Sequence, residues 1–371
     1  MRIGLIIPNF SIGGIEVSFQ KLANHFSKNH DVFILYFDET GPLKDGYSSN
    51  VNFYKIEAKG FVKTILGISQ AINLNKLDIL LSSMYMLGNY SIIAKYLSRS
   101  KCKVVIGARS DFVSVRKNAK RFIDKYLLKY LSQILFKKAS MIIAVSKGVK
   151  KSIVSDLKLD ASNVIHIYNG VINDNHLKDY YEPPAHFFYN KTDQKILLFI
   201  SRFSEEKRPI DFAKICIKLM EKYEFRVVMI GEGPLEKKLS CVIDNSRYKD
   251  KFFLSGFCKD YLSYLNYSDV FILNSKFEGL PGILIEAATT NIKIISRDCD
   301  FGPREILEGI DGCTLIDPDA KKELELEIEK SLVTNITIKR DISLMKKFFH
   351  DESMRAYEEV FKNIIGAQSR T

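Results

Sequence analysis

The chain has 371 residues, of which 46% are hydrophobic and 27% are charged, and both values are ordinary for a globular protein. At about 100–200 residues per domain, this length predicts two domains. No stretch reaches the ~18 uninterrupted apolar residues of a membrane span. The first residues, MRIGLIIPNF, lack a signal-peptide cleavage pattern and predict a buried first strand. The six cysteines form no CxxC pair and no zinc spacing, so we expect reduced, mostly buried thiols in a cytosolic protein.

The net charge of +11 is unevenly distributed along the chain. Between Lys101 and Lys151 there are fourteen Lys or Arg residues against two acids, Asp111 and Asp124, so the rest of the chain is nearly neutral. Such a basic segment faces either plain solvent or something anionic. The anionic candidates are a membrane surface, a nucleic acid and a phosphorylated substrate.

Short runs of Val, Ile and Leu alternate with helical patterns through the first half of the chain. Because these runs are continuous rather than alternating, they predict strands buried on both faces, as in a parallel sheet. The predicted strands are Arg2–Pro8, Asp31–Phe37, Val51–Ile56, Asp78–Ser82, Lys103–Ala108, Met141–Val145 and Val164–Tyr168. Helices between them include Glu16–Ser27, Phe61–Asn75 and Lys120–Lys137.

The alternation of apolar runs and helical patterns stops at Lys178–Gln194, which contains Pro183-Pro184 and predicts the interdomain connection. The alternation resumes in the second half of the chain, where the predicted strands are Lys195–Ile200, Arg226–Ile230, Phe252–Ser255, Val270–Leu273, Ile292–Ser296 and Cys313–Ile316. Helices are predicted at Pro209–Lys222, Leu235–Ser246, Gly282–Thr290, Lys321–Leu332 and Ser353–Ile365. Two βαβ sheets in series indicate two Rossmann-like lobes with a cleft between them, with ligands at the carboxyl ends of the strands.

The first candidate loop is Pro8–Glu16, PNFSIGGIE, between a strand and a helix. Gly13 and Gly14 allow the backbone to approach a ligand closely, and the helix N-terminus offers N–H groups to an anion. The same glycines equally suit an ordinary strand-to-helix turn. The loop has neither a GxGxxG nor a Walker pattern, so it indicates neither a dinucleotide nor an ATP site.

Two further loops begin the second lobe. Ser201–Pro209, SRFSEEKRP, carries Arg202 and Lys207, which either bind a diphosphate and stabilise its charge as it leaves or belong to a solvated loop. Gly231–Pro234, GEGP, follows the strand RVVMI and is either part of a ligand site or a tight turn.

The most specific loop is Phe277–Glu286, FEGLPGILIE, after the strand DVFILNS. Glu278 in the loop and Glu286 in the next helix could accept hydrogen bonds from the hydroxyls of a sugar and of a ribose. The helix is expected to begin near Pro281, and its first amides could meet a diphosphate.

Asp298 and Asp300 form a DxD pair inside Arg297–Ile306, RDCDFGPREI. In enzymes of another architecture such a pair holds a divalent metal. Here the pair follows a strand of a Rossmann-like lobe, which favours a turn and helix start at Phe301–Glu305. We therefore expect no metal site and no cofactor.

The ordered set GGIE, IYNGV, SRFSEEKRP, GEGPLEKKL, FEGLPGILIE and GPREIL resembles the retaining glycosyltransferase family 4, the group 1 glycosyl transferases of GT-B fold. One motif alone would be weak, whereas the set in this order is highly specific. The resemblance implies an α/β chain of two Rossmann-like lobes facing across a cleft. It implies an acceptor-binding lobe at 1–180, a nucleotide-sugar-binding lobe at 190–345 and a terminal helix at about 350–366 that packs back on the first lobe.

The resemblance also implies roles for single residues. Arg202 and Lys207 match the family's diphosphate-binding pair. Glu278 and Glu286 match the two glutamates of its EX7E motif, which contact the donor sugar and the ribose. Gly14 matches the glycine loop near the donor phosphates. Further donor-binding candidates are Gly231, Glu232, Gly279, Leu280, Pro281, Gly282 and Ile283.

The chain departs from the family at one place. Many members carry a histidine after a first-lobe strand, near the donor sugar, whereas the corresponding stretch here, VIGARSDF, offers Arg109, Ser110 and Asp111. Arg109 is predicted to replace that histidine as a hydrogen-bond donor. Glu16 and Asp111 are further candidates on the acceptor or sugar side.

The segment Arg116–Lys138, RKNAKRFIDKYLLKYLSQILFKK, has the pattern of a basic amphipathic helix. Such a helix either lies at an anionic membrane interface or packs its apolar stripe on the sheet and leaves its charged face in solvent. The first reading predicts a cytoplasmic protein held peripherally on the inner face of the plasma membrane.

The resemblance implies retention of the anomeric configuration. Because no carboxylate has to be a covalent nucleophile, we expect front-face attack by a metal-independent hexosyltransferase. It would move a hexose or N-acetylhexosamine from a UDP-sugar, or alternatively a GDP-sugar, to a lipid-linked or surface-polysaccharide glycan. Two alternatives are a nucleotide-sugar 2-epimerase of similar fold and a basic nucleic-acid-binding protein. The second is disfavoured because the chain has no helix-turn-helix, zinc, RRM or KH signature.

Overall fold

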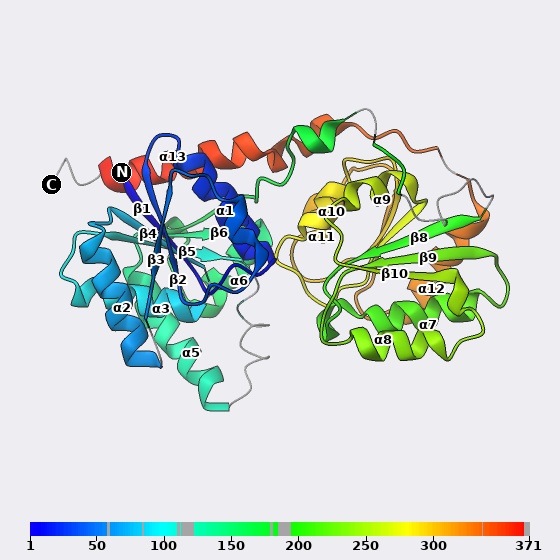
Figure 1. Cartoon of the computed structure of the whole chain (residues 1–371), viewed down its shortest axis with the longest axis horizontal. Helices are drawn as coiled ribbons and strands as arrows, with labels where there is room; N and C mark the ends of the chain where they lie inside the picture. Colours follow the sequence, from blue (N-terminus) through cyan, green and yellow to red (C-terminus); the bar gives the residue numbers. More distant parts are fainter. Residues whose placement is uncertain are drawn as a thin grey trace. The chain divides into compact units, whose positions relative to one another are not determined.

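The structure is a computed structural model that describes residues 1–57, 60–83, 85–109, 112, 122–178, 181–184, 194–335 and 337–366. The chain divides into two compact units, Met1–Gly170 with His350–Thr371, and Val171–Phe349. The first change of unit therefore lies upstream of the segment 178–194. Each unit is a parallel β-sheet covered by helices (Figure 1), which confirms the predicted α/β class of two Rossmann-like lobes.

The sheet of the first unit has seven parallel strands in the order β3-β2-β1-β4-β5-β6-β7. Every strand lies within two residues of its predicted bounds, because runs that are buried on both faces leave a clear signal in the sequence. The strands are β1 (Arg2–Ile7), β2 (Asp31–Tyr36), β3 (Val51–Lys55), β4 (Ile79–Ser83), β5 (Lys103–Ala108), β6 (Met141–Ala144) and β7 (Val164–His166).

Helices cover both faces of this first sheet (Figure 1). The helices of the unit are α1 (Gly14–Phe26), α2 (Phe61–Leu74), α3 (Tyr85–Leu97), α5 (Phe122–Leu135), α6 (Lys147–Leu157) and α13 (His350–Gly366). Alternate residues of a strand face opposite sides of the sheet. In β1, Ile3, Leu5 and Ile7 therefore pack with helices α1 and α13, whereas Ile6 packs with helix α2 on the other face.

The C-terminal helix α13 belongs to the core of the first unit. Phe361 is fully buried, and its ring lies 5.3 Å from that of Phe26 in α1. At the start of the helix, Ser353 Oγ donates to the carbonyl of Tyr168 at 2.8 Å. A Cβ on Gly170 would lie only 2.7 Å from His350 Cα, so the two segments touch through backbone. The buried side chains of α13 therefore belong to the same core cluster as those of β1 and α1.

The sheet of the second unit has six parallel strands in the order β10-β9-β8-β11-β12-β13, again close to their predicted bounds. They are β8 (Lys195–Ile200), β9 (Phe225–Ile230), β10 (Phe252–Gly256), β11 (Val270–Leu273), β12 (Lys293–Arg297) and β13 (Cys313–Ile316). Figure 1 shows α7, α8 and α12 on one face of this sheet and α9, α10 and α11 on the other. These helices are α7 (Pro209–Leu219), α8 (Glu236–Asp244), α9 (Tyr261–Tyr267), α10 (Gly282–Ala287), α11 (Pro303–Leu307) and α12 (Lys321–Val333).

The strand order reverses once in each sheet, between β1 and β4 in the first unit and between β8 and β11 in the second. Loops that leave neighbouring strands at such a point go to opposite faces of the sheet and open a crevice at the carboxyl edge. In the second unit these are the loops that carry SRFSEEKRP and FEGLPGILIE. The topology therefore places two of the predicted motifs side by side.

Among the described residues, no helix combines the length and the apolar character needed to cross a membrane. All six cysteines are free thiols. Cys102, Cys216 and Cys299 are buried, and Cys241 is exposed.

We predict that Phe361→Ala lowers the free energy of unfolding by about 3 kcal/mol, because it removes a ring from a closed core and leaves a cavity. Asn363→Ala, two residues along the same helix on its exposed side, should change it by less than about 0.5 kcal/mol. Urea unfolding followed by circular dichroism measures both changes. Equal effects of the two substitutions would mean that α13 does not pack on the first sheet.

Candidate functional site

An ion pair joins the two loops at the switch point of the second sheet. Lys207, the last residue of the 3-10 turn Glu205–Lys207, places its Nζ 2.5 Å from Glu278 Oε1. The two side chains are 22% and 10% exposed, so the pair is largely withdrawn from water. A backbone bond from Lys276 N–H to the carbonyl of Glu206, 2.7 Å, holds the same loops together.

A buried arginine lies close to these loops. Arg297, at the end of β12, is only 1% exposed, and its Nε donates to Asn274 Oδ1 at 2.6 Å. Its Nη1 donates to the carbonyls of Asp317 and Pro318, and Asn274 Nδ2 donates to the carbonyl of Arg208 at 3.0 Å. Burial and the nearby Arg208 charge lower the pKa of Arg297. These bonds tie the end of β12 to the loops that follow β8, β11 and β13.

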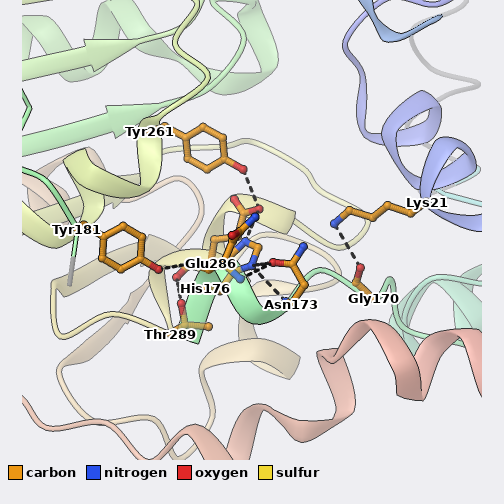
Figure 2. Close-up of polar contacts among 9 residues, drawn as sticks. Lys21, Gly170, Asn173, His176, Tyr181, Tyr261, Glu286 and Thr289 are labelled. Atoms are coloured by element: carbon orange, nitrogen blue, oxygen red, sulfur yellow. Dashed lines mark hydrogen bonds and ion pairs between the residues drawn. The ribbon is translucent and has the colours of Figure 1, made fainter. Parts of the chain in front are cut away.

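The second motif glutamate, Glu286, has a different environment (Figure 2). It lies in α10, is 9% exposed, and its Oε1 meets the hydroxyl of Tyr261 at 2.9 Å and His176 Nε2 at 3.4 Å. Burial and, to a smaller extent, the Glu286 charge raise the pKa of Tyr261, so this phenol remains a hydrogen-bond donor at neutral pH. A carboxylate with two protein donors on one oxygen is held in a single orientation.

Arg202, in the loop after β8, is exposed. Its guanidinium has no hydrogen bond or ion pair with the residues that the structure describes, while its carbonyl accepts the N–H of Ser204 at 2.9 Å. The structure therefore brings Lys207 and Glu278 into contact and gives Glu286 separate partners.

The glycines of GEGP are explained by backbone packing. A Cβ on Gly231 would lie 1.9 Å from the carbonyl oxygen of Ser201, and one on Gly233 would lie 2.5 Å from that of Phe203. Both glycines have positive φ values, of 140° and 159°. Glu232 between them is exposed, and its Oε1 accepts the N–H of Phe257 at 3.2 Å. This geometry favours the tight-turn interpretation of the motif.

The segment between the two motif glutamates packs against the turn that follows β12. Gly302, with φ of 97°, touches this segment so closely that a Cβ there would lie 2.6 Å from Pro281 Cδ. The buried members of the segment are Gly279, Leu280 and Pro281, and the partly exposed members at the start of α10 are Gly282 and Ile283. The first residue of the GPREI motif, Gly302, thus packs directly against the FEGLPG loop.

One residue of the DxD pair, Asp298, makes an ion pair within the chain. Asp298 Oδ2 accepts a hydrogen bond from Arg304 Nη2, and Asp300 is exposed. In the part of the chain that the structure describes, no three His, Cys, Asp or Glu side chains gather as metal ligands would.

In the first unit, Gly13 and Gly14 differ. A Cβ on Gly13 would lie 2.3 Å from Glu16 Oε2, whereas a Cβ on Gly14 would meet nothing within 4 Å. Burial raises the pKa of Glu16. Gly14 is exposed, so packing within this unit does not explain why the position lacks a side chain.

Arg109 makes contacts within the first unit. Its Nη1 donates to Asn169 Oδ1 and, at 3.0 Å, to Ser18 Oγ, and its Nη2 donates to the hydroxyl of Tyr357 at 3.1 Å. It thus connects the end of β5 to α1, to α13 and to the residue before Gly170. Its assignment as a substitute for the family's histidine remains a prediction, and Asp111 lies outside the described residues.

Two family models match the chain. Residues 12–174 match Glycosyltransferase Family 4, and residues 184–341 match Glycosyl transferases group 1. The chain belongs to the family 4 glycosyltransferases. This confirms the family predicted from the ordered motifs.

Two curated relatives of this family 4 glycosyltransferase cover different shares of it. An uncharacterised glycosyltransferase of Methanocaldococcus jannaschii is 31% identical over 175 residues, which are 46% of this chain and 43% of that protein. The match therefore spans less than half the length of this relative. The N-acetylgalactosamine-N,N'-diacetylbacillosaminyl-diphospho-undecaprenol 4-alpha-N-acetylgalactosaminyltransferase of Campylobacter jejuni is 23% identical over 271 residues, 72% of this chain and 69% of that protein.

Solved structures resemble the whole chain. A glycosyltransferase from Rickettsia africae has a TM-score of 0.77 at 17% identity and covers 98% of both chains. HepE of Anabaena in complex with UDP-glucose has a TM-score of 0.73 at 14% identity and covers 100% of both. At these identities the likeness concerns the fold, and it confirms the GT-B architecture predicted for this family 4 glycosyltransferase.

The sequence interpretation missed His176, Tyr261, Asn274 and Arg297. His176 follows Asn173 at the spacing of a helix-capping pair, which would have been a local signal for the turn. Its contact with Glu286, 110 residues further on, has no local signal. A buried Arg297 at the end of a strand also could not be told from a solvated one by pattern alone.

Burial, helped by the nearby Glu278 charge and opposed by Lys207, raises the pKa of the Cys299 thiol to about 12. We therefore predict that native Cys299 stays protonated and unmodified by iodoacetamide between pH 7 and pH 9, while exposed Cys241 is alkylated. Peptide mass spectrometry measures both sites, and urea-unfolded protein, in which both react, is the control. Equal labelling of the two native thiols would contradict this environment for Cys299.

Proposed function

We propose that this chain is a retaining hexosyltransferase that moves a hexose or N-acetylhexosamine from a UDP-sugar to a lipid-linked or surface-polysaccharide glycan. The observation that carries the proposal is the Lys207–Glu278 pair at the switch point of the second sheet, within the ordered motifs of the family. The second unit binds the donor, and the first binds the acceptor.

The main physical problem in this reaction is the charge on the leaving group. When the bond between the anomeric carbon and the phosphate breaks, negative charge builds on the departing diphosphate. The positive charges of Lys207 and Arg202 stabilise that negative charge. The exposed Arg202 side chain can turn toward a bound phosphate. With two cations in these positions, the proposed reaction requires no divalent metal.

The two carboxylates recognise hydroxyl groups. Glu278, fixed by Lys207, accepts from the hydroxyls of the donor sugar, and Glu286 accepts from the ribose. Attack by the acceptor on the same face from which the diphosphate leaves keeps the anomeric configuration and needs no covalent nucleophile. A carboxylate that accepts from a sugar hydroxyl strengthens its hold as the ring becomes positively charged.

Gly14 supports a ligand-facing role for the GGIE loop. Beyond its own helix, a Cβ on this residue would meet no atom of the described residues within 4 Å, so these residues leave room for a side chain there. Close approach of the donor phosphates to the start of α1 would explain why the position is glycine.

The donor and acceptor classes rest on relatives. HepE of Anabaena was solved with UDP-glucose, and the Campylobacter jejuni relative is by its name a transferase to a diphospho-undecaprenol-linked glycan. A UDP-sugar and a glycan on a lipid diphosphate are accordingly the substrates we propose.

We predict that Lys207→Ala and Glu278→Gln each lower kcat about 10²- to 10³-fold, the usual effect of removing one group that stabilises transition-state charge. Transfer of labelled sugar from UDP- or GDP-sugars to an undecaprenyl-diphosphate-linked acceptor measures it. Thermal unfolding midpoints should stay within a few degrees of wild type.

The matched controls are Lys214→Ala and Glu236→Gln, which change exposed residues of the same unit and should leave kcat unchanged. Near wild-type turnover in the Lys207 or Glu278 variants would contradict the roles given to them. Release of a free epimerised sugar in the absence of acceptor would instead identify a nucleotide-sugar 2-epimerase.

We further propose that the acceptor lobe touches an anionic membrane on the cytoplasmic side through a basic-apolar face on α2, α3 and α5. Helix α3 contacts both α2 and α5. Exposed apolar side chains on these three helices include Phe61, Val62, Leu66, Leu74, Tyr96, Leu97, Tyr130 and Ile134. Lysines lie among them. Lys95 and Lys138 place Nζ 4.4 and 5.8 Å from the Tyr96 ring centre, and Lys137, Lys138 and Lys158 line a hollow of about 470 Å³. Residues 116–121 of the predicted amphipathic helix lie outside the described part.

We predict that the protein binds vesicles containing phosphatidylglycerol and not vesicles of phosphatidylcholine alone. Reversing two charges, Lys137→Glu with Lys138→Glu, should weaken binding at least about thirtyfold, since each basic residue contributes ~1 kcal/mol near such a surface. Co-sedimentation measures the partition. Lys237→Glu with Lys238→Glu, exposed in α8 of the other unit, is the control. Binding that does not depend on the anionic lipid would overturn the proposal.

A further inference from the structure

Two residues outside the motifs that mark the family contact the Glu286 carboxylate. Tyr261 comes from the start of α9, after β10, and His176 comes from the turn Asp174–Leu177, just after the chain enters the second unit. Both reach the same oxygen, Oε1, at 2.9 and 3.4 Å. Figure 2 shows the Tyr261 and His176 side chains beside Glu286. The side chains of His176 and Glu286 are only 6% and 11% exposed, so water contributes little to this contact.

The ring of His176 is fixed by Asn173. Nδ1 lies 3.2 Å from the backbone N–H of Asn173 and 2.8 Å from its side-chain Oδ1. The opposite nitrogen, Nε2, faces Glu286. Because a carboxylate can only accept, Nε2 carries a proton in this contact. Asn173 thereby holds the ring with Nε2 toward Glu286.

The two donors occupy one side of the Glu286 carboxylate. Each carboxylate oxygen has two acceptor positions, and those of Oε1 are met by Tyr261 and His176. Among the residues that the structure describes, no donor reaches Oε2. A ribose presents two neighbouring hydroxyls, and two hydroxyl donors match the two acceptor positions of that oxygen.

We propose that Tyr261 and His176 are positioning residues, which orient the Glu286 carboxylate so that Oε2 accepts from the 2′- and 3′-hydroxyls of the donor nucleotide. The inference rests on the ribose role of Glu286 given under the proposed function. Pre-orienting the carboxylate lowers the cost of ordering it when the ligand binds. The preference for a ribonucleotide over its dideoxy analogue then depends on both residues.

The experiment compares two ligands in each variant by isothermal titration calorimetry. The ligands are UDP, or GDP if thermal stabilisation of the wild type selects it, and the corresponding 2′,3′-dideoxynucleoside diphosphate. In the wild type, UDP should bind at least about tenfold more tightly than the dideoxy analogue. In Tyr261→Phe and in His176→Leu this ratio should fall to about threefold or less, through weaker UDP binding alone. Comparing two ligands within one variant cancels any partial loss of folded protein.

Two controls separate positioning from a general structural effect. His176→Gln keeps an N–H donor at the position of Nε2 and should retain most of the wild-type ratio. Tyr267→Phe, on the same helix, loses the hydrogen bond to the carbonyl of Tyr181 and should leave the ratio unchanged. A wild-type ratio in Tyr261→Phe and in His176→Leu would overturn the inference.

Failure of the proposed function gives a different result. If the wild type and Glu286→Gln bind the two ligands with the same ratio, Glu286 does not hold the ribose, and both the assignment and this inference are wrong. If Glu286→Gln loses the preference while Tyr261→Phe and His176→Leu keep it, the ribose assignment stands and only the inference is wrong.

Discussion

The ion pair between Lys207 and Glu278 is the contact on which the rest of the second unit's site depends. The residues lie 71 positions apart, yet they meet because parallel strands end at the same edge of a sheet and the strand order reverses between β8 and β11. Each charge is largely withdrawn from water, so each needs the other. Removing either partner would leave the other as an unpaired charge at this edge of the sheet.

Hydrogen bonds from neighbouring residues hold the loops around this pair in place. Arg297, buried and charged, donates to Asn274 and to two carbonyls after β13, and Asn274 in turn binds the carbonyl next to Lys207. A buried guanidinium satisfied by neutral acceptors keeps its positive charge inside the site. Arg297 therefore ties together the loops that place Lys207 and Glu278 at the same edge of the sheet.

The two motif glutamates are held by opposite means. Glu278 pairs with a cation, whereas Glu286 accepts from a phenol and from an imidazole. The second arrangement leaves one oxygen of Glu286 without a donor from the described residues. The glycines of the predicted site are also of two kinds. Gly231 and Gly233 are required by backbone contacts within the protein, and Gly14 is not.

By itself, the sequence determined the strands, the two-lobed parallel architecture and the motifs that mark the family, because all of these depend on local patterns. Runs of Val, Ile and Leu show burial on both faces, and Pro209 and Pro303 mark helix starts. Only the tertiary structure decided the partners of the motif residues. Arg109, predicted to face a sugar, contacts Tyr357, 248 residues away, and Glu286 contacts His176 across 110 residues. Such pairs arise from strand order and from the packing of helices on the sheet, and neither leaves a periodic trace in the chain.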